Sequence, residues 1–142
     1  MTRSLFIDTD IFLDTLLKRP PHCDSSDRLL GMCEGAEAQG HSSTLIMANL
    51  YFILRKISSH EKAVLAIQKI RSYIKILPLT DKEIGESIQA GFRDFEDGLQ
   101  YFICVNHSIK VFITRNVKDF KKAAIPVLSP KEYLESLAPL KA

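Results

Sequence analysis

The sequence contains no long apolar run, and its few cysteines are not arranged in pairs. No stretch approaches the roughly 20 apolar residues that a membrane-spanning helix needs. The apolar run near the N-terminus is short and is interrupted by acids, so we expect no signal peptide. The three cysteines form no CxxC pair and are odd in number, which argues against a zinc site. We therefore expect a cytoplasmic protein with buried or idle thiols.

The sequence also lacks a strong excess of charge of either sign. The net charge is +2, with Lys and Arg spread along the chain, so charge alone does not identify a nucleic-acid-binding protein. Hydrophobic residues make up 46% and charged residues 25%, which is typical of a soluble globular protein and argues against global disorder. With 142 residues and no repeat, linker or low-complexity segment, residues 1–142 are expected to form one domain.

Short β-prone segments alternate with helical patterns along the chain. Strands are expected at residues 5–7, 42–45, 73–77, 111–113 and 126–128. Helices are expected from Asp10 to Pro20, over residues 22–39, 46–57, 60–72, 80–91 and 94–107, and from Ser129 onward. This alternation predicts an α/β fold with a central parallel sheet.

Local signals mark several of the expected helix ends. Asp10 and Ser59 are predicted N-caps, and Gly40 is predicted to stop the second helix. The spacing of Thr80 and Glu83 matches a capping box, and residues 129–132 combine a Ser N-cap, a Pro at the first helical position and a Glu two residues later.

Acidic and polar side chains follow two of the expected strands. Asp8 and Asp10 come after the first strand, and the turn at residues 114–116, which leads to Asp119, comes after the strand at 111–113. In parallel sheets, ligands collect beyond the carboxyl ends of the strands. These two regions are therefore expected to border one site.

Two helices are expected to add polar groups to that site. Asn49 lies early in the helix over residues 46–57. Asp94 and Asp97 are three residues apart, so a helix places them on one face. Glu96 lies about a third of a turn away from Asp97 and is not expected to join them.

Carboxylates gathered in a crevice repel one another, and a divalent cation reverses the sign of that interaction. Oxygen ligands without Cys or His favour Mg²⁺ or Mn²⁺ over zinc. Such an ion activates water and stabilises charge on a phosphate. The pattern thus indicates metal-dependent hydrolysis of a phosphodiester.

Each acid also has a purely structural interpretation. Asp8 can simply end a strand, Asp10 can be only a cap, and Asp119 can be a surface turn residue. Asp94 and Asp97 can complement the dipole at a helix N-terminus. Asp14 is expected to be a solvated helix position or a partner for a nearby backbone donor, with a metal role as the lesser alternative. The order and spacing of the whole set favour a joint site.

The motifs resemble the PIN-domain family, small nucleases that include the VapC toxins of toxin–antitoxin pairs. The resemblance runs nearly end to end, through "FIDTDIFLDTLLKR", "STLIMANLYFILRK", "DFEDGLQYF", "VFITRNVKDF" and "IPVLSPKEYL", of which the last three are the most specific. The nearest branch has Asn at the helix position and a "DFED" block. The resemblance implies a three-layer fold with a twisted parallel sheet flanked by helices.

The resemblance also implies an endoribonuclease that uses Mg²⁺ or Mn²⁺. It assigns catalytic and metal-binding roles to Asp8, Asp97 and Asp119, with Asp94 as a further metal ligand. It assigns supporting roles to Asp10, Asn49, Thr114 and Asn116. Implied partners are RNA, a small antitoxin that covers the acidic crevice, and a second copy of the chain. Cationic residues that lie beside the site in the sequence are candidates to hold the RNA backbone, with a solvated basic turn as an equal alternative for each: Arg115, Lys118, Lys121 and Lys122.

One position departs from the family pattern. Many active relatives have Glu where this chain has Asn49, and an amide brings no negative charge and cannot serve as a general base. One hypothesis is that Asp94 restores the missing charge. The alternative is a non-catalytic PIN fold that binds RNA or protein.

Two further alternatives concern other segments. A receiver-like or small-molecule phosphatase domain is disfavoured because the strand at 73–77 is followed by Pro78, Leu79 and Thr80, with no acid at its tip. The apolar residues 51–54 are a candidate dimer patch, although core packing is the simpler interpretation.

Overall fold

The computed structural model describes residues 3–121 and 123–137, and its centre is a five-stranded parallel sheet. The strands are β1 (Arg3–Ile7), β2 (Ala38–Ser43), β3 (Ile74–Leu77), β4 (Val111–Ile113) and β5 (Val127–Leu128). Their order is β3-β2-β1-β4-β5, and all neighbours are parallel. The predicted α/β fold is confirmed. The chain builds outward from β1 in both directions, so the strand order switches between β1 and β4, where open α/β sheets bind ligands.

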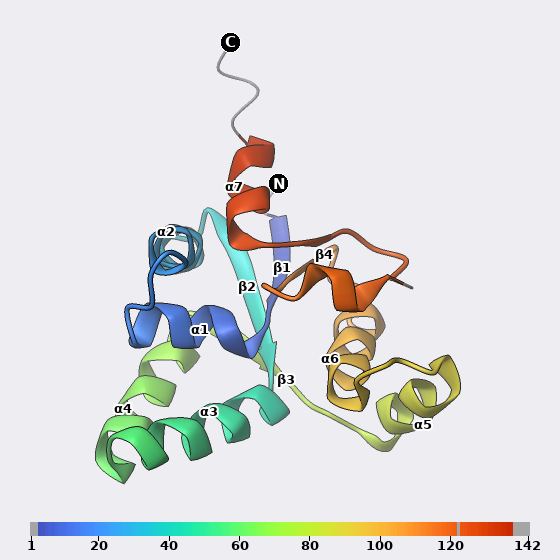
Figure 1. The fold of residues 1–142 in the computed structure, drawn as a ribbon, viewed down its shortest axis with the longest axis horizontal. Helices are drawn as coiled ribbons and strands as arrows, with labels where there is room; N and C mark the ends of the chain where they lie inside the picture. The colour runs from blue at the N-terminus through green and yellow to red at the C-terminus, as the bar shows by residue number, and fades with distance from the viewer. Residues whose placement is uncertain (1–2, 122, 138–142) are drawn as a thin grey trace.

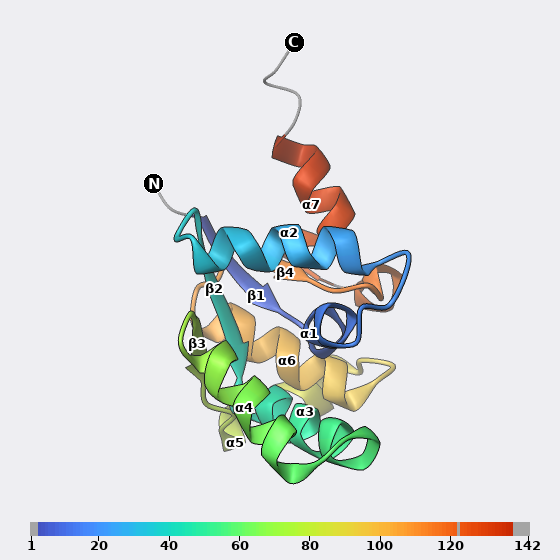
Figure 2. The same ribbon diagram turned by 90° about the vertical axis from the view of Figure 1, so that its left-hand side faces the viewer.

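Helices cover both faces of this sheet (Figures 1 and 2). The described residues form α1 (Thr9–Leu16), α2 (Cys23–Glu34), α3 (Thr44–Ile57), α4 (His60–Arg71), α5 (Asp81–Ala90), α6 (Phe95–Asn106), the 3-10 helix η1 (Val117–Phe120) and α7 (Pro130–Leu137). Helices α1 to α4 lie on one side of the sheet and α5 and α6 on the other, which gives three layers. Within the described part of the chain, no helix is both long and apolar enough to cross a membrane.

The hydrophobic core lies on both faces of the adjacent strands β1 and β4. Leu5, Phe6 and Ile7 of β1 are fully buried. The ring of Phe6 stacks on that of Phe112 in β4, with 5.2 Å between the ring centroids. Strands buried on both faces appear in a sequence as continuous apolar runs, which is why these two strands were predictable.

Most predicted caps are confirmed. Ser59 caps α4 by accepting a hydrogen bond from the backbone N–H of Lys62, and Thr80 and Glu83 form the predicted capping box of α5. Ser129 and Glu132 likewise cap α7 reciprocally. The prediction that Asp10 caps α1 is wrong. Asp8 is the N-cap, and Asp10 lies in the first turn.

The region between α2 and α3 differs from the prediction. Helix α2 ends at Glu34 instead of residue 39, and β2 begins at Ala38 instead of residue 42. The polar sequence of β2 concealed a central strand. Two of its buried polar side chains are satisfied by β1: Ser42 Oγ donates to the carbonyl of Ile7 at 3.0 Å, and His41 Nδ1 lies 3.3 Å from the carbonyl of Leu5.

Gly40 is a strand residue and not the predicted helix stop. A Cβ atom at this position would lie 2.4 Å from Ile74 Cδ1 and 2.9 Å from Cys33 Sγ. Glycine is therefore needed for close packing of β2 against its neighbours. The cysteines are free thiols, as expected: Cys33 and Cys104 are buried, and Cys23 is partly buried.

Candidate active site

An open crevice of about 420 Å³ lies beyond the carboxyl ends of β1 and β4. It is lined by Asp8, Thr9, Asp10, Asn49, Phe52, Ile53, Asp94, Glu96, Asp97, Asn116 and Asp119. These residues come from the segments that follow β1 and β4, from helices α1 and α3, from the start of α6, and from η1, which contains Asp119. The structure thus brings Asp8, Asp97 and Asp119 to one cavity, although they are far apart in the sequence.

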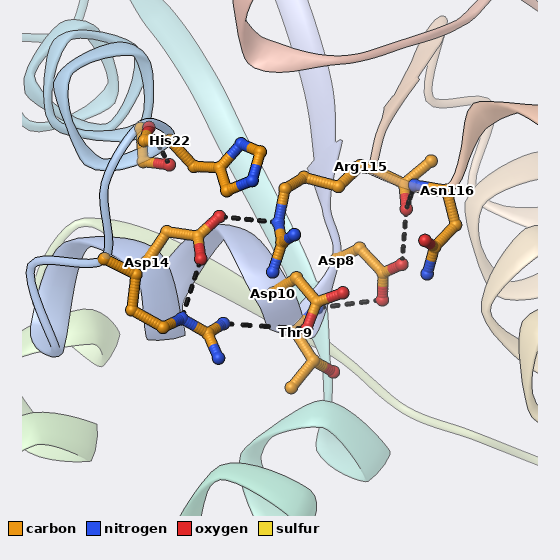
Figure 3. Close-up of polar contacts among 10 residues, drawn as sticks. Asp8, Thr9, Asp10, Asp14, His22, Arg115 and Asn116 are labelled. Atoms are coloured by element: carbon orange, nitrogen blue, oxygen red, sulfur yellow. Dashed lines mark hydrogen bonds and ion pairs between the residues drawn. The ribbon is translucent and has the colours of Figure 1, made fainter.

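Asp8 is the most constrained acid of the crevice (Figure 3). Its Oδ1 accepts a hydrogen bond from the backbone N–H of Thr9, and its Oδ2 accepts one from Thr114 Oγ1, both at 2.8 Å. Thr114 is fully buried and also accepts a hydrogen bond from the N–H of Asn116. Burial raises the pKa of Asp8 to about 6, even though the two hydrogen bonds act in the opposite direction.

Asp94 and Asp97 lie at the start of α6. Asp94 is its N-cap and accepts a hydrogen bond from the N–H of Asp97 at 3.1 Å. Burial is the largest cause that raises the pKa of Asp97 to about 7, followed by the charges of Asp94, Asp8, Glu96 and Asp119. Because carboxylates from separate elements act on Asp97, the crevice concentrates negative charge.

Glu96 also lines the crevice, contrary to the sequence prediction. Its Oε2 accepts a hydrogen bond from Asn49 Nδ2 at 2.7 Å. The prediction considered only the angle between Glu96 and Asp97 around the helix axis. The Glu side chain is longer than that of Asp and extends to α3. Burial and the charge of Asp94 raise the pKa of Glu96. A polar residue on a facing helix, Asn49, was the sequence signal for this contact.

Asp14 lies outside the crevice, and the expectation of a solvated residue is wrong. Its side chain is fully buried between two arginines (Figure 3). Arg19 Nε lies 2.9 Å from its Oδ1, and Arg115 Nε lies 2.8 Å from its Oδ2. Arg19 also lies 3.8 Å from Asp10. Asp14 therefore connects α1 to the turn that follows β4.

Two pockets containing cationic side chains adjoin the acidic crevice. One, of about 290 Å³, is lined by Gly91, Phe92, Arg93, Lys118, Asp119 and Lys121. The other, of about 400 Å³, is lined by Pro21, His22, Ser25, Arg115, Asn116, Ser129, Pro130 and Lys131. Asp119 belongs to the first pocket and to the crevice, and Asn116 to the second and to the crevice. Lys122 lies outside the described residues.

The donors of the crevice suit a hard divalent cation. Its acids and amides provide oxygen ligands, and none of the described residues that line it is Cys or His. Among residues 3–121 and 123–137, no three Asp, Glu, His or Cys side chains lie close enough together to hold an ion directly. Mg²⁺ usually keeps several waters and binds through one or two carboxylates, so such a separated set of acids still fits. The raised pKa values of Asp8 and Asp97 are the electrostatic cost that a cation would relieve.

Residues 4–118 match the PIN domain family, and the chain belongs to this family. A search of curated proteins found no match. Solved structures share the fold. A toxin–antitoxin complex from Klebsiella pneumoniae has a chain that is 22% identical, with a TM-score of 0.67, covering 89% of this chain and 98% of that one.

Two further structures have the same fold at lower identity. DNA-bound VapBC from Salmonella typhimurium is 14% identical, with a TM-score of 0.68 and coverage of 92% of this chain and 99% of that chain. VapC20 from Mycobacterium tuberculosis, a sarcin-ricin loop cleaving toxin, is 13% identical, with a TM-score of 0.62 and coverage of 77% and 87%, respectively. The three-layer PIN fold predicted from the sequence is confirmed.

Proposed function

We propose that this protein is a metal-dependent endoribonuclease of the cytoplasm, the toxin of a toxin–antitoxin pair, with residues 1–142 acting as one domain. The observation that carries the proposal is the meeting of Asp8, Asp97 and Asp119 in one crevice at the switch point of the sheet. Membership of the PIN family and the likeness to toxin structures support the nuclease class.

In this proposal Asp8, Asp97 and Asp119 hold Mg²⁺ or Mn²⁺ mostly through bound water, with Asp94 as a further member of the site. When bound, the ion supplies a Lewis acid that stabilises the charge developing on the phosphate. Thr114 and the N–H of Thr9 fix both oxygens of Asp8, so its carboxylate is oriented before substrate arrives. Hydrolysis adds water to the phosphorus and breaks its bond to a sugar oxygen.

The two cationic pockets give the RNA a path across the crevice. Lys118 and Lys121 line one pocket, and Arg115 and Lys131 line the other. They would bind phosphates that flank the one being cleaved, offsetting repulsion between RNA and the acids. Arg115 is held by Asp14, so its guanidinium is pre-oriented for this contact.

The antitoxin and dimer surfaces are part of the same proposal. Of residues 51–54, Leu54 is buried in the core, whereas Phe52 is 64% exposed and, with Ile53, lines the crevice. A segment with apolar and basic side chains would cover Phe52 and pair with the acids. Ile57, 56% exposed on the same helix, extends the apolar surface available to a second copy of the chain. Solved toxin–antitoxin complexes with this fold support a protein partner.

The direct test is cleavage of a labelled single-stranded RNA by purified protein with Mn²⁺. We expect cleavage that EDTA stops and that falls by about 100-fold or more in Asp8→Asn and Asp97→Asn, because each loses a negatively charged ligand. Glu61→Gln is the control, since this exposed acid of α4 lies outside the crevice. Equal cleavage by all variants would assign the activity to a contaminant. RNA binding without cleavage would favour the non-catalytic alternative suggested by Asn49.

A further inference from the structure

We infer that Glu96 supplies the carboxylate that Asn49 does not, and that Asn49 is the residue that positions it. The inference rests on the proposed function, because it assigns Glu96 to the same metal site. It starts from the 2.7 Å hydrogen bond between Asn49 Nδ2 and Glu96 Oε2, formed at the wall of the acidic crevice. Both side chains are half-buried, so neither is free to move as an exposed residue would be.

The chemistry of the pair fixes its orientation. An ionised carboxylate only accepts hydrogen bonds, so the amide nitrogen of Asn49 must face it. The bond is charge-assisted, and it stabilises the ionised form of Glu96. Glu96 Oε1 accepts no hydrogen bond within the described part of the chain and is left available to a ligand.

The two helices that carry this pair are joined at a second point. Ser43, the N-cap of α3, donates a hydrogen bond from Oγ to Gln100 Oε1 at 2.7 Å. Both residues are fully buried. Gln100 lies four residues after Glu96 and therefore on the same face of α6. This buried contact fixes the position of α6 relative to the start of α3. The backbone of the two helices therefore already holds Asn49 and Glu96 within hydrogen-bonding distance.

Glu96 fits the missing charge better than Asp94 does. Asp94 is exposed, and its Oδ1 already caps α6 by accepting from the N–H of Asp97. Glu96 is half-buried and in direct contact with residue 49. A Glu at position 49 would face Glu96 as a like charge, whereas Asn donates to it. Compared with a relative that has Glu at position 49, the carboxylate of this pair lies on α6 instead of α3. The crevice therefore keeps the same number of negative charges.

The test compares Mn²⁺ affinity, measured by calorimetry, with RNA cleavage for a set of variants. Glu96→Gln should weaken Mn²⁺ binding by about tenfold or more and slow cleavage. The swap Asn49→Glu with Glu96→Gln should restore Mn²⁺ binding to within about threefold of wild type, because it returns one carboxylate beside one amide. Asp94→Asn should weaken Mn²⁺ binding less than Glu96→Gln does.

The chain contains a matched control. Asn106 Nδ2 donates to Glu86 Oε1 at 2.7 Å between α6 and α5, both residues are half-buried, and neither lines the crevice. Glu86→Gln should change folding stability about as much as Glu96→Gln but leave Mn²⁺ affinity unaltered. Melting temperatures of all variants separate loss of the ligand from loss of the fold.

Two results overturn the inference: Mn²⁺ affinity in Glu96→Gln equal to that in Glu86→Gln, or a swap variant that binds no better than Glu96→Gln alone. If Glu96→Gln binds Mn²⁺ and cuts RNA as well as an active wild type does, only the proposed role of Glu96 is rejected. A wild type that neither binds Mn²⁺ nor cuts RNA removes the proposed function as well.

Discussion

Arg115 Nε lies 2.8 Å from Oδ2 of Asp14, a carboxylate with no exposed surface (Figure 3). This ion pair joins the interior of α1 to the turn after β4. The same turn carries Thr114, which holds Asp8. The ion pair therefore fixes the relative position of α1 and of the turn after β4, the two segments that border the crevice at the ends of β1 and β4.

Asp14→Asn should destabilise the fold substantially. Removing the buried carboxylate leaves two partly exposed arginines without their ion-pair partner, which costs about 1–3 kcal/mol. Denaturant unfolding measures the loss. Asp27→Asn, an exposed acid in α2, is the control and should change the free energy of unfolding by less than about 0.5 kcal/mol. Equal stability of the two variants would contradict a structural role for the pair.

Thr114→Val should raise the pKa of Asp8 further. The substitution keeps the shape of the side chain but removes the hydroxyl that donates to Asp8 Oδ2, a contact that lowers the pKa. The carboxyl carbon signal of Asp8, followed by NMR across pH without divalent ions, reports the change. Thr114→Ser keeps the hydroxyl and should titrate like wild type. A midpoint shared by all three proteins would exclude this role for Thr114.

Without divalent ions, the acidic crevice should make the protein less stable as pH rises. The pKa values of Asp8 and Asp97 are raised from 3.8 to about 6 and about 7, so the folded state retains protons that the unfolded chain releases. Their contribution to stability is complete below about pH 4 and is lost as pH rises to about 7. For buried Asp8 the loss is on the order of 3 kcal/mol, because one pKa unit corresponds to about 1.4 kcal/mol.

The measurement is the free energy of unfolding in EDTA, from pH 4 to pH 8. It compares wild type with the double variant that carries both Asp8→Asn and Asp97→Asn. Subtracting the two curves removes the contribution of other groups, including Glu83, whose pKa shifts downward. We expect the variant to gain stability over wild type as pH rises. A constant difference would mean that the two acids are not under electrostatic strain.

Cationic residues of the two pockets that adjoin the crevice should contribute separately to RNA binding. In an Asp8→Asn background, which is expected not to cut, Lys118→Ala and Lys131→Ala should each weaken binding of a single-stranded RNA. Each should also reduce the slope of log affinity against log salt by about 0.7, the value for one phosphate contact. Lys62→Ala, in the exposed first turn of α4, should leave the slope unchanged. If only one of the two lysine variants responds, the RNA does not contact both pockets as proposed.

The sequence predicted the parts of the fold that depend on local patterns. Strands β1 and β4 were found because each is a short apolar run. Helices α4, α5 and α7 were found because a cap signal precedes each of them. Strand β2 was misplaced because its buried polar residues are satisfied by long-range bonds from Ser42 and His41 to β1. Such contacts leave no periodic signal in the sequence.

The same limit applies to the candidate site. The acids that follow strand ends could be placed together from topology alone, as Asp8 and Asp119 are. The contacts of Glu96 and Asp14 depend on which side chain of another element lies opposite them. Asn49 and Arg115 are those partners, 47 residues from Glu96 and 101 from Asp14, respectively. Local helix geometry could not reveal either pair.

The central claim is that the acids of the crevice form a site for a hard divalent cation. The most direct measurement is calorimetric titration of the protein with Mn²⁺ at pH 6.5, in two buffers of different ionisation enthalpy. The account predicts saturable Mn²⁺ binding that releases protons from Asp8 and Asp97. The double variant with Asp8→Asn and Asp97→Asn should lose both the binding and the proton release. Binding that releases no protons and is equally tight in the variant would contradict it.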